Sequence, residues 1–312
     1  MKKSLFLGGS LLSALFFSTL SASAMAASAD KPVVVVSSKM DTEGGILGNM
    51  IIDVLNAHGL KTQNRLQLGG TPIVRKAIIA GDIDIYPEYT GNGAFFFNKA
   101  SDPLWKNATK AYEEVKSLDY AANKLVWLTP APADNTWGIA VTDKVATTDH
   151  LKTMSDFAKY IRNGGSIKLA ASSEFVNSPA ALPSFEKTYN FTFKPKDLLI
   201  LSGGNTAAAI SAAAQGTNGV NAAMVYGTDG GIAASNLTVM NDNLHVQPVY
   251  QPTPVIREAI LADYPGIAEW LKPVFLSLNL TTLQKLNSEV EVDGEPANVV
   301  AENYLKTNGF LK

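Results

Sequence analysis

The chain has 312 residues, of which 46% are hydrophobic and 17% charged, a globular balance that is long enough for about two domains. It has no cysteine, which excludes disulfides, thiolate metal sites, iron–sulfur clusters, a cysteine nucleophile and lipidation of an N-terminal cysteine. A net charge of −2 gives no basic footprint for nucleic acid, and the widely spaced His58, His150 and His245 support neither a metal centre nor a catalytic triad.

The N-terminal segment has the features of a secretory signal peptide. Lys2 and Lys3 give a positive start, an apolar stretch covers residues 5–20, and residues 24–26 (Ala-Met-Ala) fit the small-x-small cleavage rule. A membrane anchor is disfavoured because the apolar stretch is short and interrupted by glycines and serines. We therefore expect residues 1–26 to be removed, leaving a periplasmic protein that carries no lipid anchor.

Short apolar runs then alternate with helical patterns. The first part of the chain predicts strands at residues 33–36, 66–68 and 83–86, with helices at 46–55 and, after Thr71 as N-cap, up to Ala80. This β-α-β-α-β order is typical of a doubly wound parallel sheet. Strands at 125–128 and 137–141 flank a loop rich in proline and alanine, which we interpret as a first crossing between domains.

A second α/β pattern covers residues 155–226, and the proline-containing stretch 247–254 is interpreted as the return crossing. Four helices close the chain, near residues 257–262, 266–276, 283–290 and 297–307. The pattern predicts an α/β fold of the two-lobed, type II-like periplasmic binding protein class, with a mostly parallel sheet flanked by helices in each lobe and two hinge crossings. We expect residues 27–134 and 251–312 to form lobe 1, and residues 135–250 to form lobe 2.

Polar and aromatic side chains follow the predicted strands and lie at the crossings. They come from five places: Lys39, residues 86–92, residues 135–137, residues 226–229 and Tyr250. Ligands of open α/β sheets bind at the carboxyl ends of strands. A quaternary ammonium has no N–H to donate, and aromatic faces attract it by contact and charge at ~0.5–2 kcal/mol per ring. The alternative is that these residues bind no ligand: each tyrosine is then packed in the fold, and Lys39 is a solvated surface charge.

Three motifs resemble a known family. Ser38-Lys39 with Glu43 and the Leu-Gly-Asn of residues 47–49, the Asp-Ile-Tyr-Pro-Glu-Tyr-Thr-Gly of residues 84–91, and the Tyr-Gly-Thr-Asp of residues 226–229 are similar to those of the glycine betaine/choline-binding proteins of osmoprotectant ABC importers, the ProX/OpuC type. The similarity is greatest to the periplasmic branch of that family and covers nearly the whole mature chain.

The resemblance also implies a set of ligand-binding residues. The family's aromatic cage corresponds to Tyr89, Trp137, Tyr226 and Tyr250, and the lysine that meets the ligand carboxylate corresponds to Lys39. Three further polar residues complete the candidate set, namely Thr90, Asn92 and Asn135.

Two positions depart from the family pattern. Asn92 stands where threonine is frequent, and Ser178 follows the Glu-Phe pair after which the family has an arginine that grips the ligand carboxylate. Loss of a charged bidentate donor predicts weaker glycine betaine affinity than in the high-affinity importers, or a shifted substrate preference.

Together these observations predict a periplasmic solute-binding protein for glycine betaine or a related choline-type compatible solute. It would hand the solute to an inner-membrane ABC permease, as a monomer, with no cofactor, metal, catalysis or nucleic-acid partner. One alternative is a binding protein for an amino acid or polyamine, which would use carboxylates such as those of Asp84, Glu88 and Asp229. A second alternative, a periplasmic α/β enzyme, would need a nucleophile–base pair that the scattered histidines do not offer.

Overall fold

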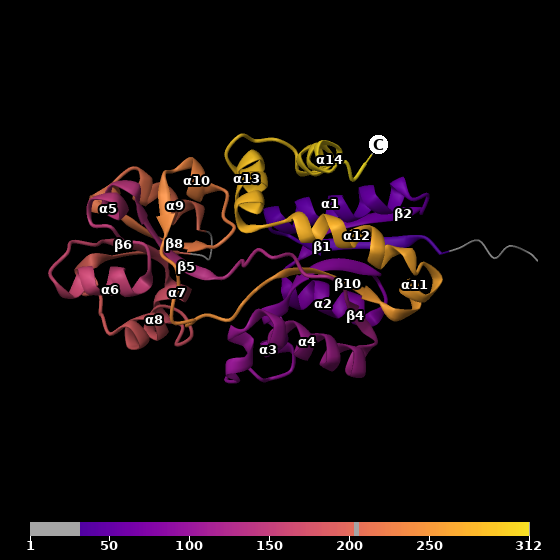
Figure 1. Cartoon of the computed structure of the whole chain (residues 1–312), viewed down its shortest axis with the longest axis horizontal. Coiled ribbons are helices and arrows are strands. Elements are labelled where there is room, and N and C mark those ends of the chain that lie inside the picture. The colour runs from indigo at the N-terminus through magenta and orange to yellow at the C-terminus, as the bar shows by residue number, and fades with distance from the viewer. Residues whose placement is uncertain (1–31, 203–205, 312) are drawn as a thin grey trace, which may run out of the picture. The chain divides into compact units, whose positions relative to one another are not determined.

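The computed structural model describes residues 32–202 and 206–311, so the predicted signal peptide lies outside the described residues. Two five-stranded sheets, each flanked by helices, make up two lobes joined by two connecting segments (Figure 1). Within residues 32–202 and 206–311, no helix has both the length and the apolar character needed to cross a membrane.

Lobe 1 is built on a sheet with strand order β2-β1-β3-β10-β4. Strands β1 and β2, and β1 and β3, pair in parallel, whereas β10 runs antiparallel to both of its neighbours. The strands are β1 (Val34–Lys39), β2 (Thr62–Gly69), β3 (Ile85–Tyr89), β4 (Leu125–Trp127) and β10 (Pro252–Arg257). This order places the ends of β1 and β3 at one edge of the sheet.

Helices cover both faces of the first sheet because its strands are apolar on both sides. Val34 and Val36 pack into one cluster with the C-terminal helices, whereas Val35 faces a second cluster that contains Trp105 and Trp127. The helices are α1 (Thr42–Ala57), α2 (Thr71–Ala80), α3 (Gly93–Phe96), α4 (Ala108–Asn123), α11 (Glu258–Asp263), α12 (Gly266–Ser277), α13 (Leu280–Glu291) and α14 (Ala297–Thr307).

Lobe 2 repeats this arrangement with strand order β7-β6-β8-β5-β9. Alternate residues of its strands face two separate apolar clusters, so this sheet is also buried on both faces. Its strands are β5 (Trp137–Thr142), β6 (Leu169–Ser172), β7 (Leu198–Leu201), β8 (Ala222–Tyr226) and β9 (Leu237–Val239). Its helices are α5 (Asp143–Thr148), α6 (Met154–Arg162), α7 (Ser173–Asn177), α8 (Leu182–Tyr189), α9 (Ala207–Ala214) and α10 (Gly231–Ala234).

The two connecting segments lie side by side and are hydrogen-bonded to each other (Figure 1). The backbone N–H of Asn135 donates to the carbonyl of Tyr250 at 3.0 Å. In return, the N–H of Tyr250 donates to Asp134 Oδ1 at 2.8 Å, and the Thr136 hydroxyl donates to the carbonyl of Pro248 at 2.8 Å. These contacts fix Asn135 and Tyr250 next to each other, although they are far apart in the sequence.

Several predicted elements differ in detail from those observed. The helix predicted at residues 46–55 begins already at Thr42, where Asp41 caps it by accepting from the N–H of Gly44 at 2.7 Å. Thr71 is the first residue of α2 and not its N-cap, because Gly70 occupies that position without a side-chain hydrogen bond. The predicted end of this helix at Ala80 is confirmed, since Gly81 adopts a left-handed φ of 82°.

Candidate ligand-binding site

A cavity of about 530 Å³ lies where the strand ends of both sheets meet, and residues of both lobes line it. The aromatic lining residues are Tyr89, Phe95, Trp137, Tyr226 and Tyr250. The acidic ones are Asp41, Glu43, Glu174, Asp229 and Glu291, while Lys39 is the single basic residue among them. Neutral polar side chains complete the lining, namely Thr42, Thr71, Asn92, Asn135, Thr228 and Asn287. The cavity is therefore aromatic and carries an excess of carboxylates.

Trp137 and Tyr226 form an aromatic wall contributed by lobe 2. They are direct cross-strand partners, because Trp137 opens β5 and Tyr226 ends the antiparallel strand β8. Their ring centroids lie 6.2 Å apart with an interplanar angle of 25°, and Phe175 supports Trp137 edge-on at 6.1 Å. This packing fixes the ring orientations from behind, so the wall does not depend on a ligand for its position.

Tyr89 and Tyr250 contribute rings from lobe 1 and from the return crossing. Tyr89 ends β3 directly opposite Pro252 of β10, and Tyr250 lies two residues before that strand. The Tyr250 ring packs so closely on Gly91 that a Cβ there would lie 2.7 Å from ring carbons. Glycine at this position of the Glu-Tyr-Thr-Gly segment thus leaves room for the Tyr250 ring.

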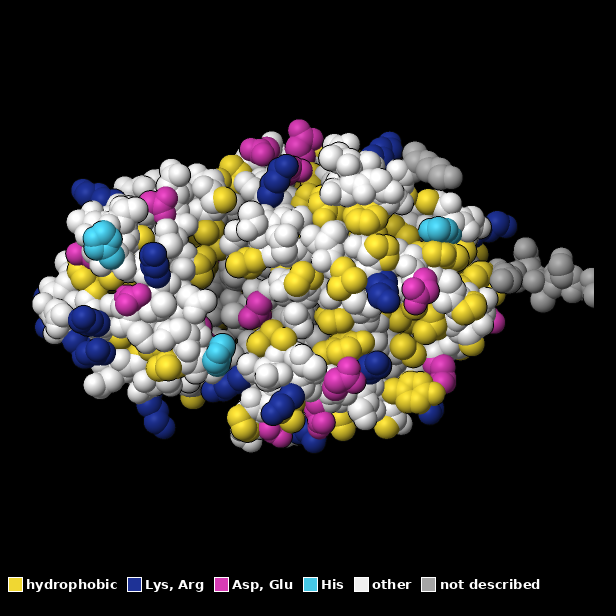
Figure 2. Space-filling model, in the orientation of Figure 1, with side chains coloured by type: hydrophobic (Ala, Val, Ile, Leu, Met, Phe, Trp, Pro, Cys, Tyr) yellow, Lys and Arg dark blue, Asp and Glu magenta, His cyan; other side chains and the backbone are white. Residues whose placement is uncertain are grey.

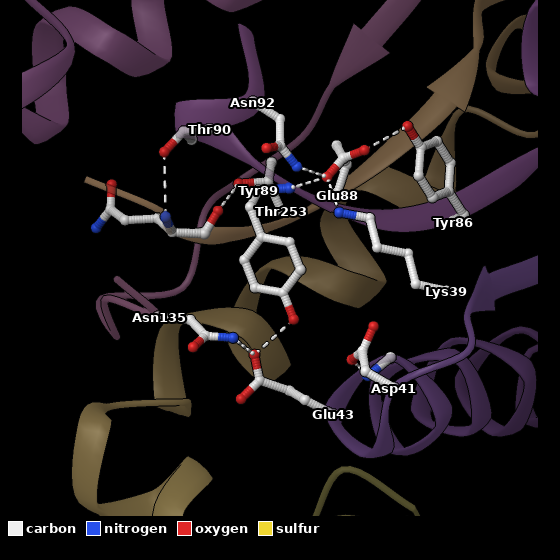
Figure 3. Close-up of polar contacts among 12 residues, drawn as sticks. Lys39, Asp41, Glu43, Tyr86, Glu88, Tyr89, Thr90, Asn92, Asn135 and Thr253 are labelled. Carbon is white, nitrogen blue, oxygen red and sulfur yellow. Dashed lines mark hydrogen bonds and ion pairs between the residues drawn. The ribbon is translucent and has the colours of Figure 1, made fainter. Parts of the chain in front are cut away.

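Lys39 is held by a buried carboxylate next to the cavity (Figure 3). Its Nζ forms an ion pair with Glu88 Oε1, and Glu88 is fully buried. The same carboxylate accepts from the Tyr86 hydroxyl at 2.9 Å, the Tyr89 N–H at 2.7 Å and Asn92 Nδ2 at 2.7 Å. Lys39 Nζ also lies 4.6 Å from the centroid of the Tyr89 ring. The charge of the one lining base is thus already compensated within the protein.

Glu43 lies in the first turn of α1, on the other side of the Tyr89 ring from this ion pair (Figure 3). The hydroxyl of Tyr89 donates to Glu43 Oε1 at 2.7 Å, and Asn135 Nδ2 donates to the same oxygen at 3.4 Å. Burial raises the pKa of the Glu43 carboxyl, and the nearby Asp41 carboxylate adds to that increase.

Helix α13 closes the cavity by contacting both lobes. Asn287 Nδ2 donates to Glu43 Oε2 at 2.9 Å and to the carbonyl of Thr228 at 2.8 Å, while Gln284 Nε2 donates to the carbonyl of Gly227 at 2.8 Å. A Cβ on Gly230 would lie 2.3 Å from the backbone nitrogen of Ser288 in this helix. Glycine at position 230 therefore permits the backbone of lobe 2 to touch α13.

Two further carboxyls of the cavity hold their protons more strongly than usual. Burial raises the pKa of Asp229 to about 7, although its carboxylate accepts from the N–H of Tyr226 at 2.7 Å. Burial also raises the pKa of Glu291. In the described part of the chain, no group of three or more histidine or acidic side chains is arranged to hold a metal ion.

Residues 32–307 match the model of the substrate-binding domain of the ABC-type glycine betaine transport system. The chain belongs to this family. It is 55% identical to the glycine betaine-binding protein YehZ of Escherichia coli over 89% of the chain and 92% of that protein. It is also 27% identical to a glycine-betaine-binding protein of Pseudomonas aeruginosa, over 88% of each chain.

Solved structures agree with the family assignment. The structure of apo YehZ from Escherichia coli covers 89% of this chain with a TM-score of 0.83 and 55% identity, and 99% of that chain is matched. The predicted family and the predicted two-lobed α/β fold are thus confirmed. The prediction of mostly parallel sheets is wrong, because each sheet has two parallel and two antiparallel strand pairs. The family is a substrate-binding component of ABC-type transporters.

The structure brings together all the predicted site residues except one. Seven of them line the same cavity, namely Lys39, Tyr89, Asn92, Asn135, Trp137, Tyr226 and Tyr250. Thr90 is not among the lining residues, because it is fully buried and fastens β3 to the return crossing. Its hydroxyl donates to the carbonyl of Val249 at 3.1 Å and accepts from the N–H of Gln251 at 3.1 Å.

Ser178 and Phe95 differ in their relation to the cavity. Ser178 follows α7 and does not line the cavity, whereas Glu174 of the same helix does. Phe95 opens a run of three phenylalanines, is 56% exposed and lines the cavity. Phe96 and Phe97 pack against the apolar cluster around Trp105.

Two lining residues that are prominent in the structure lie outside the set of site residues that the sequence predicts. Glu43 belongs to the first of the three family motifs, and Asn287 lies in a C-terminal helix far in sequence from every strand end of the predicted site. A buried acid in the first turn of α1, directly after the end of β1, was the local signal for Glu43. Asn287 had no such signal, because only tertiary packing brings α13 to the cavity.

Proposed function

We propose that this family member captures a quaternary-ammonium compatible solute, glycine betaine or a choline-type compound, for an inner-membrane ABC permease. The observation that carries the proposal is the set of four aromatic side chains, Tyr89, Trp137, Tyr226 and Tyr250, around one cavity with an excess of carboxylates. Aromatic faces and negative charge together attract a cation that has no N–H group. The names of the Escherichia coli and Pseudomonas aeruginosa relatives, both glycine betaine-binding proteins, support the same ligand class.

The mechanism is capture between two lobes. We assign residues 27–134 and 251–312 to lobe 1 and residues 135–250 to lobe 2, with the paired crossings as hinges. A ligand that contacts Tyr89 on one lobe and Trp137 on the other favours a closed form, because only that form makes both sets of contacts. No covalent step is involved. The signal-peptide pattern of residues 1–26 supports a periplasmic location of the mature protein.

Replacement of Trp137 tests the proposal. Trp137→Ala is expected to weaken glycine betaine and choline binding by about 3- to 30-fold, the equivalent of one desolvated cation–π contact. Isothermal titration calorimetry of both ligands measures the change. Trp270→Ala is the matched control, because Trp270 stacks on His58 and does not line the cavity. Equal affinities of Trp137→Ala and the unmodified protein, or no binding of any quaternary amine, would reject the proposal.

The carboxylate-rich lining favours a second candidate function, capture of an amino acid or a polyamine. Primary ammonium groups donate hydrogen bonds, and five acidic side chains line the cavity to accept them. The same calorimetric series distinguishes the two functions. Strong binding of putrescine or of ordinary amino acids, with Trp137→Ala nearly neutral, would favour this second function.

A further inference from the structure

Glu43 differs from the other deeply buried charged side chains in its partners. Among the described residues that are less than a tenth exposed, the remaining charges form ion pairs: Lys39 with Glu88, Arg75 with Asp119, and Asp84 with Arg257. Glu43 is 4% exposed and has no cationic partner within the described residues. A buried carboxylate without a counter-ion is costly, and such groups normally occur paired.

The groups that do contact Glu43 are neutral. They are the hydroxyls of Tyr89 and Thr228 and the side-chain amides of Asn135 and Asn287. Neutral donors satisfy the oxygen atoms but supply no positive charge, and a cation bound beside Glu43 would favour its ionised form against the effect of burial. The nearby Asp41 does not help, because it is itself an acid. The missing positive charge can therefore come from a ligand in the cavity that Glu43 lines.

The free hydrogen-bonding capacity of the cavity points to the rest of the ligand. The side-chain oxygens of Asn135 and Asn287 are buried and accept no hydrogen bond from any described residue, and Asn287 is only 2% exposed. A ligand hydroxyl would donate to either of them. A ligand carboxylate would find one buried, unpartnered donor among the described residues, Trp137 Nε1. It would find no free cation in the lining, because Lys39 is engaged by Glu88 and the other charged lining residues are acids.

We infer that the cavity prefers quaternary-ammonium cations that carry a hydroxyl and no carboxylate, the choline class, over zwitterionic betaines, with Glu43 as the counter-charge. This inference rests on the proposed function and narrows its substrate class. The cationic head lies against the aromatic side chains, and the carboxylate of Glu43 approaches it from the α1 side of Tyr89. A zwitterion would bring an additional negative charge into a cavity that already has an excess of carboxylates.

Calorimetric titration of choline and glycine betaine into the unmodified protein and into Glu43→Gln tests this inference. The unmodified protein is expected to bind choline at least about tenfold more tightly than glycine betaine. Glu43→Gln is expected to weaken choline binding about tenfold and to change glycine betaine binding less than about threefold, so the preference collapses. Glu43→Asp keeps the charge and should keep the preference.

Glu269→Gln provides the matched control, because it removes the same charge from an exposed position of α12 outside the cavity. Thermal unfolding establishes that each variant is folded, and Glu43→Asp serves as the informative variant if Glu43→Gln does not fold. Tighter binding of glycine betaine than of choline, or equal weakening of both ligands in Glu43→Gln, would overturn the inference while leaving the proposed function intact. Absence of binding by every quaternary amine would overturn the proposed function itself.

Discussion

Asp119→Ala is expected to lower the free energy of unfolding by about 3–5 kcal/mol, because it leaves the Arg75 guanidinium buried without its counter-ion. Asp119 is fully buried on α4, and its carboxylate accepts hydrogen bonds from Nη1 and Nη2 of Arg75, at 2.7 and 2.6 Å. It also accepts from Trp127 Nε1 at 2.7 Å and from Asn123 Nδ2 at 2.8 Å. One substitution therefore removes partners from α2, α4 and β4 together.

Urea-induced unfolding measures this loss, and two controls define its origin. The exposed pair of Lys99 and Glu114 has side chains that are 41% and 29% exposed, so Glu114→Ala is expected to cost less than about 1 kcal/mol. The double variant Arg75→Met/Asp119→Leu removes both charges and is expected to recover most of the loss. A loss below about 1 kcal/mol for Asp119→Ala would show that this buried pair does not stabilise lobe 1.

Asp229 is expected to make the protein less stable as the pH rises from about 4 to about 7. Burial raises the pKa of this carboxyl from 3.8 to about 7, with Glu291 and Glu43 adding to the increase, whereas donors from Tyr226 and Thr206 oppose it. Between these two pH values the unfolded chain has released the proton that the folded protein retains. Stability therefore falls across this interval by up to about 1.4 kcal/mol per pH unit, and the fall ends above the folded-state pKa.

Asp229→Asn isolates this contribution, since the amide oxygen still accepts the N–H of Tyr226 but carries no titrating proton. We expect the variant to match the unmodified protein near pH 4 and to be more stable by about 2–4 kcal/mol near pH 8. Urea unfolding at a series of pH values gives both curves, with Asp293→Asn as a control at an exposed carboxylate. Parallel curves for Asp229→Asn and the unmodified protein would contradict the assignment of this pH dependence to Asp229.

Most of the α/β order could be predicted because the strands are short apolar runs and the helices have one apolar face. Strand β10 could not, because Pro252 and Pro254 lack the N–H groups that a central strand normally donates. The structure accommodates them by pairing Pro254 with Pro87 and by using both proline carbonyls as acceptors for Leu128 and Ala131. The pairing register of β10 with its neighbours, and not the strand preference of its residues, makes this strand possible.

Helix α4 could not be predicted from the sequence either, for a different reason. Its buried face consists of Ala111, Val115 and Asp119, so the helix shows almost no apolar periodicity. The charge of Asp119 makes the helix look solvent-exposed in sequence, whereas the partner that allows its burial, Arg75, lies on α2. A long-range ion pair of this kind has no local signature.

Some residues of the candidate site could be predicted from the sequence, whereas others could not. Aromatic residues at strand ends, such as Tyr89 and Tyr226, could be placed because strand polarity puts those ends at one edge of the sheet. The role of Lys39 was less predictable, since its ion pair with Glu88 depends on side-chain direction within two parallel strands. The contribution of α13 depends wholly on packing, because Asn287 reaches Glu43 across 244 residues of sequence.

The central claim is that aromatic faces and negative charge recognise a cation. Its most direct test compares the affinity for choline with that for the neutral alcohol in which carbon replaces the ammonium nitrogen. The two ligands have nearly the same shape and apolar surface, so the difference between them reports the positive charge alone. We expect choline to bind at least about tenfold more tightly, in line with ~0.5–2 kcal/mol per aromatic ring. Equal affinities would show that the cavity recognises apolar shape and would contradict the account.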